Sequence, residues 1–141
     1  MTEALLKIRG LKTFFDTEEG LVKAVNGVDL TIEKGQTLGL VGESGCGKSV
    51  TAMSILRLNP EPPTLYSGGE IFFEGQDLLT VSDATMRTVR GNKIAMIFQE
   101  PMTSLNPVYS IGNQVGEVLK LHKGMGTREA RAASIDLLDR V

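Results

Sequence analysis

The feature that most constrains this chain is the loop from Gly42 to Ser49, which reads Gly-Glu-Ser-Gly-Cys-Gly-Lys-Ser. It meets every fixed position of the phosphate-binding pattern G-x-x-x-x-G-K-[ST]. The glycines permit backbone angles and close approaches that a β-carbon would block, so successive N–H groups can turn inward around anionic oxygens. Lys48 supplies a mobile positive charge for the β- and γ-phosphates, and the Ser49 hydroxyl is placed to ligate Mg²⁺. The loop therefore predicts a polyphosphate site.

The residues on either side of this loop predict the strand–loop–helix setting that the motif needs. Residues 37–41 form an apolar run that is long enough for a buried parallel strand and too short for a helix. After the loop, apolar residues recur at roughly helical spacing from Ala52 to Leu58, until Asn59-Pro60 ends the pattern. This setting would direct the loop amides and the positive end of the helix dipole at the same phosphate.

Bulk properties exclude several classes of protein. The 141 residues, 41% hydrophobic and 23% charged, have the size and composition of about one globular domain. The net charge of −2 gives no basic field for nucleic acid. No apolar run approaches the roughly 20 residues of a membrane helix, and the first residues lack the regions of a secretory signal. A single cysteine fits a reducing compartment, so we expect a cytosolic protein.

The rest of the chain predicts an alternation of strands and helices. Asn59 to Thr64 is a proline-rich connector, and residues 33–36 form a turn. Strands are predicted over 5–11, 22–32, 69–75 and 93–98, and helices from Ser82 or Asp83 to about 91, over 111–121, and from a cap at Thr127 through Val141. The last helix reaches the final residue without a stop signal, which favours a truncated domain over a short helix that docks on the body.

Two segments together carry a resemblance to a known family. The loop with the Val-Thr-Ala that follows it, and the later run Ile97 to Pro107 (Ile-Phe-Gln-Glu-Pro-Met-Thr-Ser-Leu-Asn-Pro), resemble ATP-binding cassette (ABC) proteins. The branch most resembled is the ATPase subunits of bacterial dipeptide and oligopeptide importers. The resemblance covers essentially the whole chain and implies an α/β P-loop NTPase fold of the ABC ATPase type. The implied fold has an N-terminal antiparallel β region and the start of a helical subdomain, and it is truncated.

The resemblance also implies a division of the chain and a set of site residues. We expect a partial nucleotide-binding domain with a β region over 1–36, a P-loop core over 37–99, and a Q-loop with the start of a helical subdomain over 100–141. The expected cofactors are ATP and Mg²⁺, with Lys48 and Gln99 in catalysis and Ser49 and Gln99 at the metal. The expected nucleotide-binding residues are Phe15, Gly42, Glu43, Ser44, Gly45, Cys46, Gly47, Lys48, Ser49 and Val50.

Gln99 matches the glutamine of the family's Q-loop, and the segment Glu100 to Pro107 matches the region that faces the transmembrane permease. The resemblance therefore implies permease subunits as partners, a second ATPase subunit (identical or different), and indirectly a periplasmic or extracellular solute-binding protein. It places the protein on the cytoplasmic face of the plasma membrane. Without the resemblance, Gln99 would be an ordinary polar residue at a strand end.

Phe14 and Phe15 lie where the family keeps an aromatic residue that stacks on adenine. Phe15 is the better match, and a core phenylalanine at a strand end is the equally open alternative. Stacking of a base on an aromatic ring contributes about 1–3 kcal/mol in nucleic-acid systems.

Three further features need a separate interpretation. Ser67-Gly68-Gly69-Glu70 resembles the family's Leu-Ser-Gly-Gly-Gln signature, but its place before Gln99 predicts a turn into a β-strand instead. Cys46, beside Lys48 and a helix N-terminus, is expected to be a reactive thiol whose alkylation blocks nucleotide binding. A catalytic thiol is not expected, because His122 stands alone on a helix.

The sequence lacks the family's signature, its paired-acid strand and its switch histidine. We therefore expect the 141 residues alone to be inactive or nearly so, and the full-length relative to hydrolyse ATP for transport. Three alternatives stay open: a non-transport ABC protein that acts as an ATP-gated clamp on nucleic acid or the ribosome, a remnant that only binds nucleotide, and a small P-loop kinase or GTPase. The last would need a guanine-reading motif or a lid arginine pair, and neither is convincing here.

Overall fold

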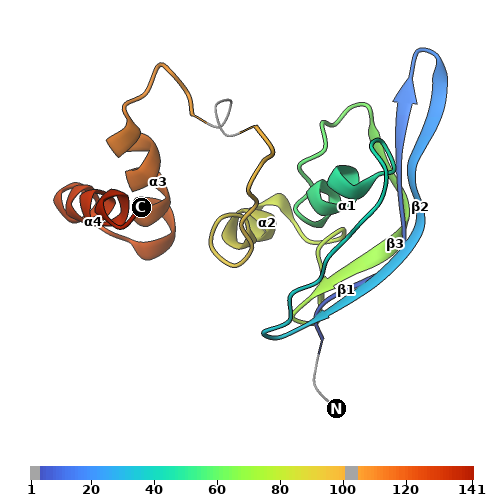
Figure 1. Ribbon diagram of the computed structural model, residues 1–141, viewed down its shortest axis with the longest axis horizontal. Coiled ribbons are helices and arrows are strands. Elements are labelled where there is room, and N and C mark those ends of the chain that lie inside the picture. The colour runs from blue at the N-terminus through green and yellow to red at the C-terminus, as the bar shows by residue number, and fades with distance from the viewer. Residues whose placement is uncertain (1–3, 101–104) are drawn as a thin grey trace. The chain divides into compact units, whose positions relative to one another are not determined.

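The computed structural model describes residues 4–100 and 105–141. The chain divides into two compact units, Met1–Met86 and Arg87–Val141. Figure 1 shows the strands and α1 in the first unit and the α3–α4 hairpin in the second. The phosphate-binding motif falls in the first unit, and Gln99 falls in the second.

An antiparallel sheet with the strand order β2-β1-β3-β4 forms the body of the first unit. The strands are β1 (Ala4–Thr17), β2 (Gly20–Glu33), β3 (Thr64–Phe73) and β4 (Gln76–Asp77). β1 and β2 form a long hairpin, which the Thr17 hydroxyl closes by donating to the Gly20 carbonyl at 2.8 Å. This arrangement confirms the N-terminal antiparallel β region.

The core of the first unit lies on the face of this sheet that α1 (Lys48–Ile55) covers. Apolar side chains at alternating positions of the central strands supply it, since alternate residues of a strand share a face. The fully buried apolar side chains of this unit are Ile8, Leu11, Ile71, Leu78 and Met86. Thr13 and Ser54 are fully buried as well, so a polar contact lies within an otherwise apolar interface.

The Ser67-Gly68-Gly69-Glu70 segment lies wholly inside β3, so it is strand and not the predicted turn into a strand. Gly69 has a φ of +90°, and a β-carbon on it would lie 2.6 Å from Cα of Leu11 in the neighbouring strand. The register of β1 against β3 shifts at this point. The glycines therefore fit a bulge between two strands.

A polar contact fixes the connection from α1 to the short helix α2 (Asp83–Val89). Arg57, with a φ of +50° just after α1, donates to the Val81 carbonyl at 2.9 Å and pairs with the Asp83 carboxylate at 2.8 Å. The helix predicted from Ser82 or Asp83 is thereby confirmed, although it ends at Val89 and not at residue 91.

The second unit contains the hairpin of α3 (Ile111–Lys123) and α4 (Thr127–Asp139). Close packing of small residues holds the two helices together: Gly116, Ala130 and Ser134 are all buried at their contact. Gly124, with a φ of +64°, ends α3. Two details differ from prediction: Gly126, not Thr127, is the N-cap of α4, and the helix ends at Asp139.

Two strand predictions are wrong for this structure. Residues 37–41 and 95–98 lie in no strand or helix, and within 93–98 only Ile94 forms an isolated bridge, to Arg90. Val41 is 91% exposed and Ile97 is 96% exposed. An apolar run becomes a parallel strand only where neighbours complete its ladder and helices cover both faces. Neither run has such a neighbour among the residues described.

Candidate nucleotide-binding site

The loop from Gly42 to Ser49 turns directly into the first turn of α1. Gly45 and Gly47 both have left-handed backbone angles, with φ of +80° and +91°. Gly47 is the N-cap of α1, and no side chain caps the helix. The N–H groups of the first helical turn have no acceptor within the helix by its geometry. They are thus available to an anion, beside the positive end of the helix dipole.

Gly47 also fixes the loop against the sheet. A β-carbon on Gly47 would lie 2.4 Å from the Ala24 carbonyl oxygen and 3.5 Å from a methyl carbon of Val25. The backbone of the loop therefore reaches β2 at a distance that only glycine allows. This contact places the phosphate loop beside the sheet independently of any side chain of the loop.

Lys48 folds back over the loop. Its Nζ donates to the carbonyl oxygens of Gly42 and Glu43 at 2.7 and 2.6 Å. The ammonium group is thereby held at the loop by two neutral acceptors. A phosphate would be a stronger acceptor for the same donors, because its oxygens carry negative charge and add Coulomb attraction to the ammonium group.

Cys46 contributes its thiol to the same cluster. Its Sγ lies 3.5 Å from Nζ of Lys48 and 2.5 Å from where a β-carbon on Gly42 would sit. The residue is exposed. The thiol therefore occupies the space that a side chain at position 42 would need, and it remains open to reagents.

The side chains of the other predicted loop residues surround this cluster. Glu43, Ser44 and Ser49 are exposed, and Val50 is half-buried. Thr51 stabilises the turn, since its N–H and its hydroxyl both donate to the Gly47 carbonyl, at 2.8 and 2.9 Å. The structure thus brings all nine predicted loop residues, 42–50, into one segment at the start of α1.

A buried polar cluster joins the back of α1 to the sheet, and sequence reasoning missed it. The Thr13 and Ser54 hydroxyls lie 2.9 Å apart, and the Asn59 amide donates to Ser54 Oγ at 3.0 Å. Ser54 Oγ donates to the Val50 carbonyl at 2.7 Å. The sequence feature that could have indicated this cluster is Ser54, whose hydroxyl lies on the apolar face of the predicted helix and therefore needs a buried partner.

The structure separates the two aromatic candidates by face. β1 pairs with β3 in an unbroken register from Thr13 to Phe15, so Phe15 shares the face of Thr13 and Phe14 points the other way. Thr13 contacts α1, which assigns Phe15 to the side of the sheet that carries the loop helix. The Phe14 ring instead lies beneath the Lys23 ammonium, at 5.9 Å from its centroid.

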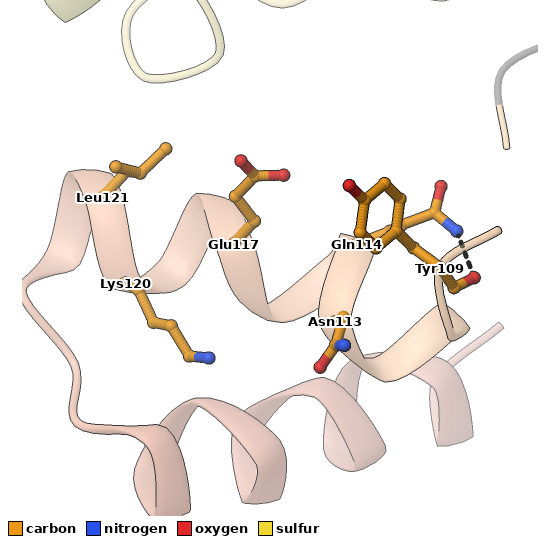
Figure 2. A pocket seen from close by; sticks show the side chains of 6 residues that line it. All are labelled: Tyr109, Asn113, Gln114, Glu117, Lys120 and Leu121. Carbon is orange, nitrogen blue, oxygen red and sulfur yellow. Dashed lines mark hydrogen bonds between the residues drawn. The ribbon is translucent and has the colours of Figure 1, made fainter. Parts of the chain in front are cut away.

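Gln99 and Glu100 lie exposed in the second unit, and residues 101–104 of the predicted partner segment fall outside the described residues. The end of that segment is tied to α3 by Gln114. Its Oε1 accepts from the Asn106 N–H at 2.8 Å, and its Nε2 donates to the Asn106 and Tyr109 carbonyls, both at 2.9 Å. Figure 2 shows Gln114 and Tyr109 joined at the start of α3.

An open groove of about 470 Å³ runs along α3 from this point. Figure 2 shows Glu117 and Leu121 on the same side of the helix as Gln114, with Asn113 and Lys120 turned toward the other side. Within the described residues, no cluster of three or more histidine, cysteine or acidic side chains could hold a metal. No described helix has both the length and the apolar character needed to cross a membrane.

Comparison with known proteins gives consistent matches along the whole chain. Residues 25–140 match the ABC transporter family. The chain is 56% identical over 141 residues to an uncharacterized ABC transporter ATP-binding protein, YejF, of Escherichia coli (100% of this chain, 27% of the relative). It is 48% identical over 136 residues to a probable peptide ABC transporter ATP-binding protein of Sinorhizobium fredii (96% and 41%). It is 49% identical over 144 aligned positions to a putative peptide import ATP-binding protein of Brucella melitensis (99% and 43%).

The same fold occurs in solved structures. The dimeric structure of MJ0796, a bacterial ABC transporter cassette, superposes with a TM-score of 0.78 at 24% identity, over 95% of this chain and 56% of that one. A second structure of that cassette, a post-hydrolysis state bound to ADP and Pi, gives the same TM-score. The chain thus spans between about a quarter and somewhat under half of the length of these curated relatives.

Proposed function

Because this chain belongs to the ABC transporter family, we propose that it forms the nucleotide-binding part of an importer ATPase. In this proposal, binding and hydrolysis of ATP by the complete protein drive the uptake of peptides or a similar solute. The observation that carries the proposal is the position of Lys48, whose ammonium group lies over a glycine loop at the N-terminus of α1. The family match and the peptide-import relatives support the same reading.

The loop would hold the phosphates of the nucleotide. Lys48 would exchange its two carbonyl acceptors for phosphate oxygens, and the N–H groups of the first helical turn would donate to the same anion. The residues that line this cradle are Gly42, Glu43, Ser44, Gly45, Cys46, Gly47, Lys48, Ser49 and Val50. The contact of Gly47 with β2 keeps the cradle in place while Lys48 moves.

The exposed Ser49 hydroxyl and the Gln99 amide oxygen have the oxygen-donor chemistry that Mg²⁺ prefers. When bound, the metal would neutralise charge on the phosphates. Ser49 directly follows Lys48 at the motif position whose hydroxyl ligates Mg²⁺, and its hydroxyl is exposed. Gln99 would also orient the attacking water in the complete enzyme.

Phe15 would stack on the adenine, which its place on the α1 side of the sheet supports.

The partners that we propose follow from the peptide-import relatives. Permease subunits would contact the segment Glu100 to Pro107, and a second ATPase subunit, identical or different, would complete the assembly at the cytoplasmic face of the plasma membrane. A solute-binding protein on the other side would act indirectly. The 141 residues contain no paired-acid strand and no signature, so we expect this chain alone to bind nucleotide without turning it over.

The proposal is tested by uptake of a labelled peptide library into liposomes. The complete protein is purified with its membrane subunits and compared with its Lys48→Ala variant. We expect uptake that requires Mg-ATP and falls by at least about tenfold in the variant, because the lysine is the mobile charge on the phosphates. If the complete protein purifies without any membrane subunit, and Mg-ATP does not change peptide uptake into the vesicles, the importer function is refuted. That result would favour a soluble clamp.

A further inference from the structure

We propose that the Thr13–Ser54 hydroxyl pair is a positioning device that sets the phosphate loop relative to the adenine-stacking residue Phe15. This inference rests on the proposed function, because it needs the loop to hold phosphates and Phe15 to hold the base. Thr13 and Phe15 occupy the same face of β1, and Ser54 occupies the inner face of α1. The pair thus joins the element that carries the base platform to the element that begins with Lys48.

The hydrogen-bond inventory fixes the direction of this contact. A serine hydroxyl has one proton and two lone pairs. The Ser54 proton goes to the Val50 carbonyl at 2.7 Å, so both oxygen lone pairs are free to accept. One accepts from the Asn59 amide at 3.0 Å, and the other accepts from the Thr13 hydroxyl at 2.9 Å. Ser54 Oγ is therefore saturated, and Thr13 is the donor.

Burial makes this contact selective for one arrangement. Thr13 and Ser54 are both 0% exposed, and Asn59 is 5% exposed. A buried hydroxyl that loses its partner has no water to replace it, which costs more than the bond itself contributes. Any slide of α1 along β1 would leave Thr13 without an acceptor and Ser54 with an empty lone pair. The apolar contacts around the pair are non-directional and would tolerate such a slide.

The consequence concerns the span between base and phosphate. Binding of ATP needs both the platform and the cradle in the correct relative position, whereas binding of inorganic tripolyphosphate needs the cradle alone. Loss of the hydroxyl pair should therefore weaken Mg-ATP and leave Mg-tripolyphosphate unchanged. A pair that acted only as a general stabiliser of the fold would change both ligands together.

The test measures dissociation constants of both ligands by calorimetry on the full natural protein. Thr13→Val removes the donor at nearly constant volume, Ser54→Ala removes the acceptor, and Thr13→Ser keeps the donor. We expect the first two to weaken Mg-ATP by about tenfold, a difference of about 1.4 kcal/mol, with tripolyphosphate within about twofold. Thr13→Ser should restore the affinity for Mg-ATP. The double variant Thr13→Val with Ser54→Ala should lose no more than either single change, since the two groups form one contact.

Ser134→Ala is the matched control. Ser134 is a buried helical serine whose hydroxyl donates to the Ala130 carbonyl at 2.7 Å, the same local bond that Ser54 makes to Val50, but it faces Gly116 of a neighbouring helix and not a strand hydroxyl. It should leave both affinities unchanged. Hydrogen exchange of the α1 amides in each variant separates unfolding from displacement, because a folded, displaced helix keeps its protection.

Each outcome has a definite meaning. Equal weakening of both ligands, or no change in either, would overturn the positioning role. If Phe15→Ala weakens Mg-ATP selectively while Thr13→Val does not, the base platform stands and this inference fails alone. A wild-type protein that binds neither ligand would refute the proposed function and the inference together.

Discussion

Gly47 approaches Ala24 so closely that a β-carbon on the glycine would lie 2.4 Å from the Ala24 carbonyl oxygen. This contact joins the phosphate loop to β2 by backbone alone. Gly45, two residues earlier, has a similar left-handed φ of +80°, but a β-carbon there would meet nothing within 4 Å. Substitutions at these two glycines can therefore be compared to separate the cost of backbone strain from that of a steric clash.

Gly47→Ala should destabilise the protein by about 2–4 kcal/mol, because left-handed strain and a clash with the β2 backbone add together. Gly45→Ala should cost only about 1–2 kcal/mol, from the strain alone. Urea unfolding followed by circular dichroism measures both. Equal losses in the two variants would show that the contact with Ala24 does not restrain the loop.

Alkylation of Cys46 should block nucleotide binding. The Cys46 thiol is exposed, lies 3.5 Å from Nζ of Lys48 and is the sole thiol of the chain. A bulky adduct there would fill the mouth of the loop. Mg-ATP at saturating concentration should slow labelling by N-ethylmaleimide about tenfold or more, in proportion to occupancy of the loop. Cys46→Ser should make binding insensitive to the reagent, and equal labelling rates with and without Mg-ATP would contradict the prediction.

Phe15→Ala should weaken Mg-ATP by the free energy of one stacking contact, about 1–3 kcal/mol. Phe14→Ala provides the control, because Phe14 lies on the opposite face beneath Lys23. It should leave the affinity within about twofold. Titration with a fluorescent ATP analogue distinguishes the two variants. A larger loss of affinity with Phe14→Ala than with Phe15→Ala would show that the adenine stacks on the opposite face of the sheet.

Gln114→Ala should release the turn that follows the proposed partner segment. Gln114 bonds to both backbone groups of Asn106 and to the Tyr109 carbonyl. A net hydrogen-bond contribution of about 0.5–1.5 kcal/mol predicts that the Asn106 amide exchanges roughly two- to twelvefold faster in the variant. Asn113→Ala changes the adjacent residue, whose side chain is exposed, and should leave this rate unchanged. Unaltered exchange in Gln114→Ala would show that solvent or another group holds the turn.

Local signals predicted most of the elements correctly. Alternating apolar residues predicted strands over 5–11 and 22–32, which lie within β1 and β2, and Gly124 predicted where α3 ends. The helix predicted to continue up to Asn59-Pro60 ends earlier, since α1 stops at Ile55. The position of Ser67-Gly68-Gly69 before Gln99 was enough to reject the family signature and to predict a turn into a strand, although the segment itself lies within β3. These features succeed because turn chemistry and periodicity depend on neighbouring residues in the chain.

Features that depend on distant partners were missed. Residues 37–41 and 93–98 have strand-like composition, but a parallel strand also needs neighbours, which no local pattern reports. The Thr13–Ser54 contact joins residues 41 positions apart, and only the fold brings them together. The family resemblance identified the loop residues. The contact of Gly47 with Ala24 and the bonds of Lys48 to the loop carbonyls came from the structure.

In the proposed function, the loop at the start of α1 binds the phosphates of Mg-ATP through Lys48. The most direct measurement is calorimetric titration of the chain with Mg-ATP, before and after Lys48→Ala. We predict one nucleotide per chain for the wild type and at least about a tenfold weaker affinity in the variant, because the phosphates lose their charged donor. Thermal unfolding should be nearly unchanged, since the partners of Lys48 Nζ (the Gly42 and Glu43 carbonyls and Cys46 Sγ) all belong to its own exposed loop. An affinity that is the same in both proteins, or no binding by the wild type, would show that Lys48 does not hold the phosphates.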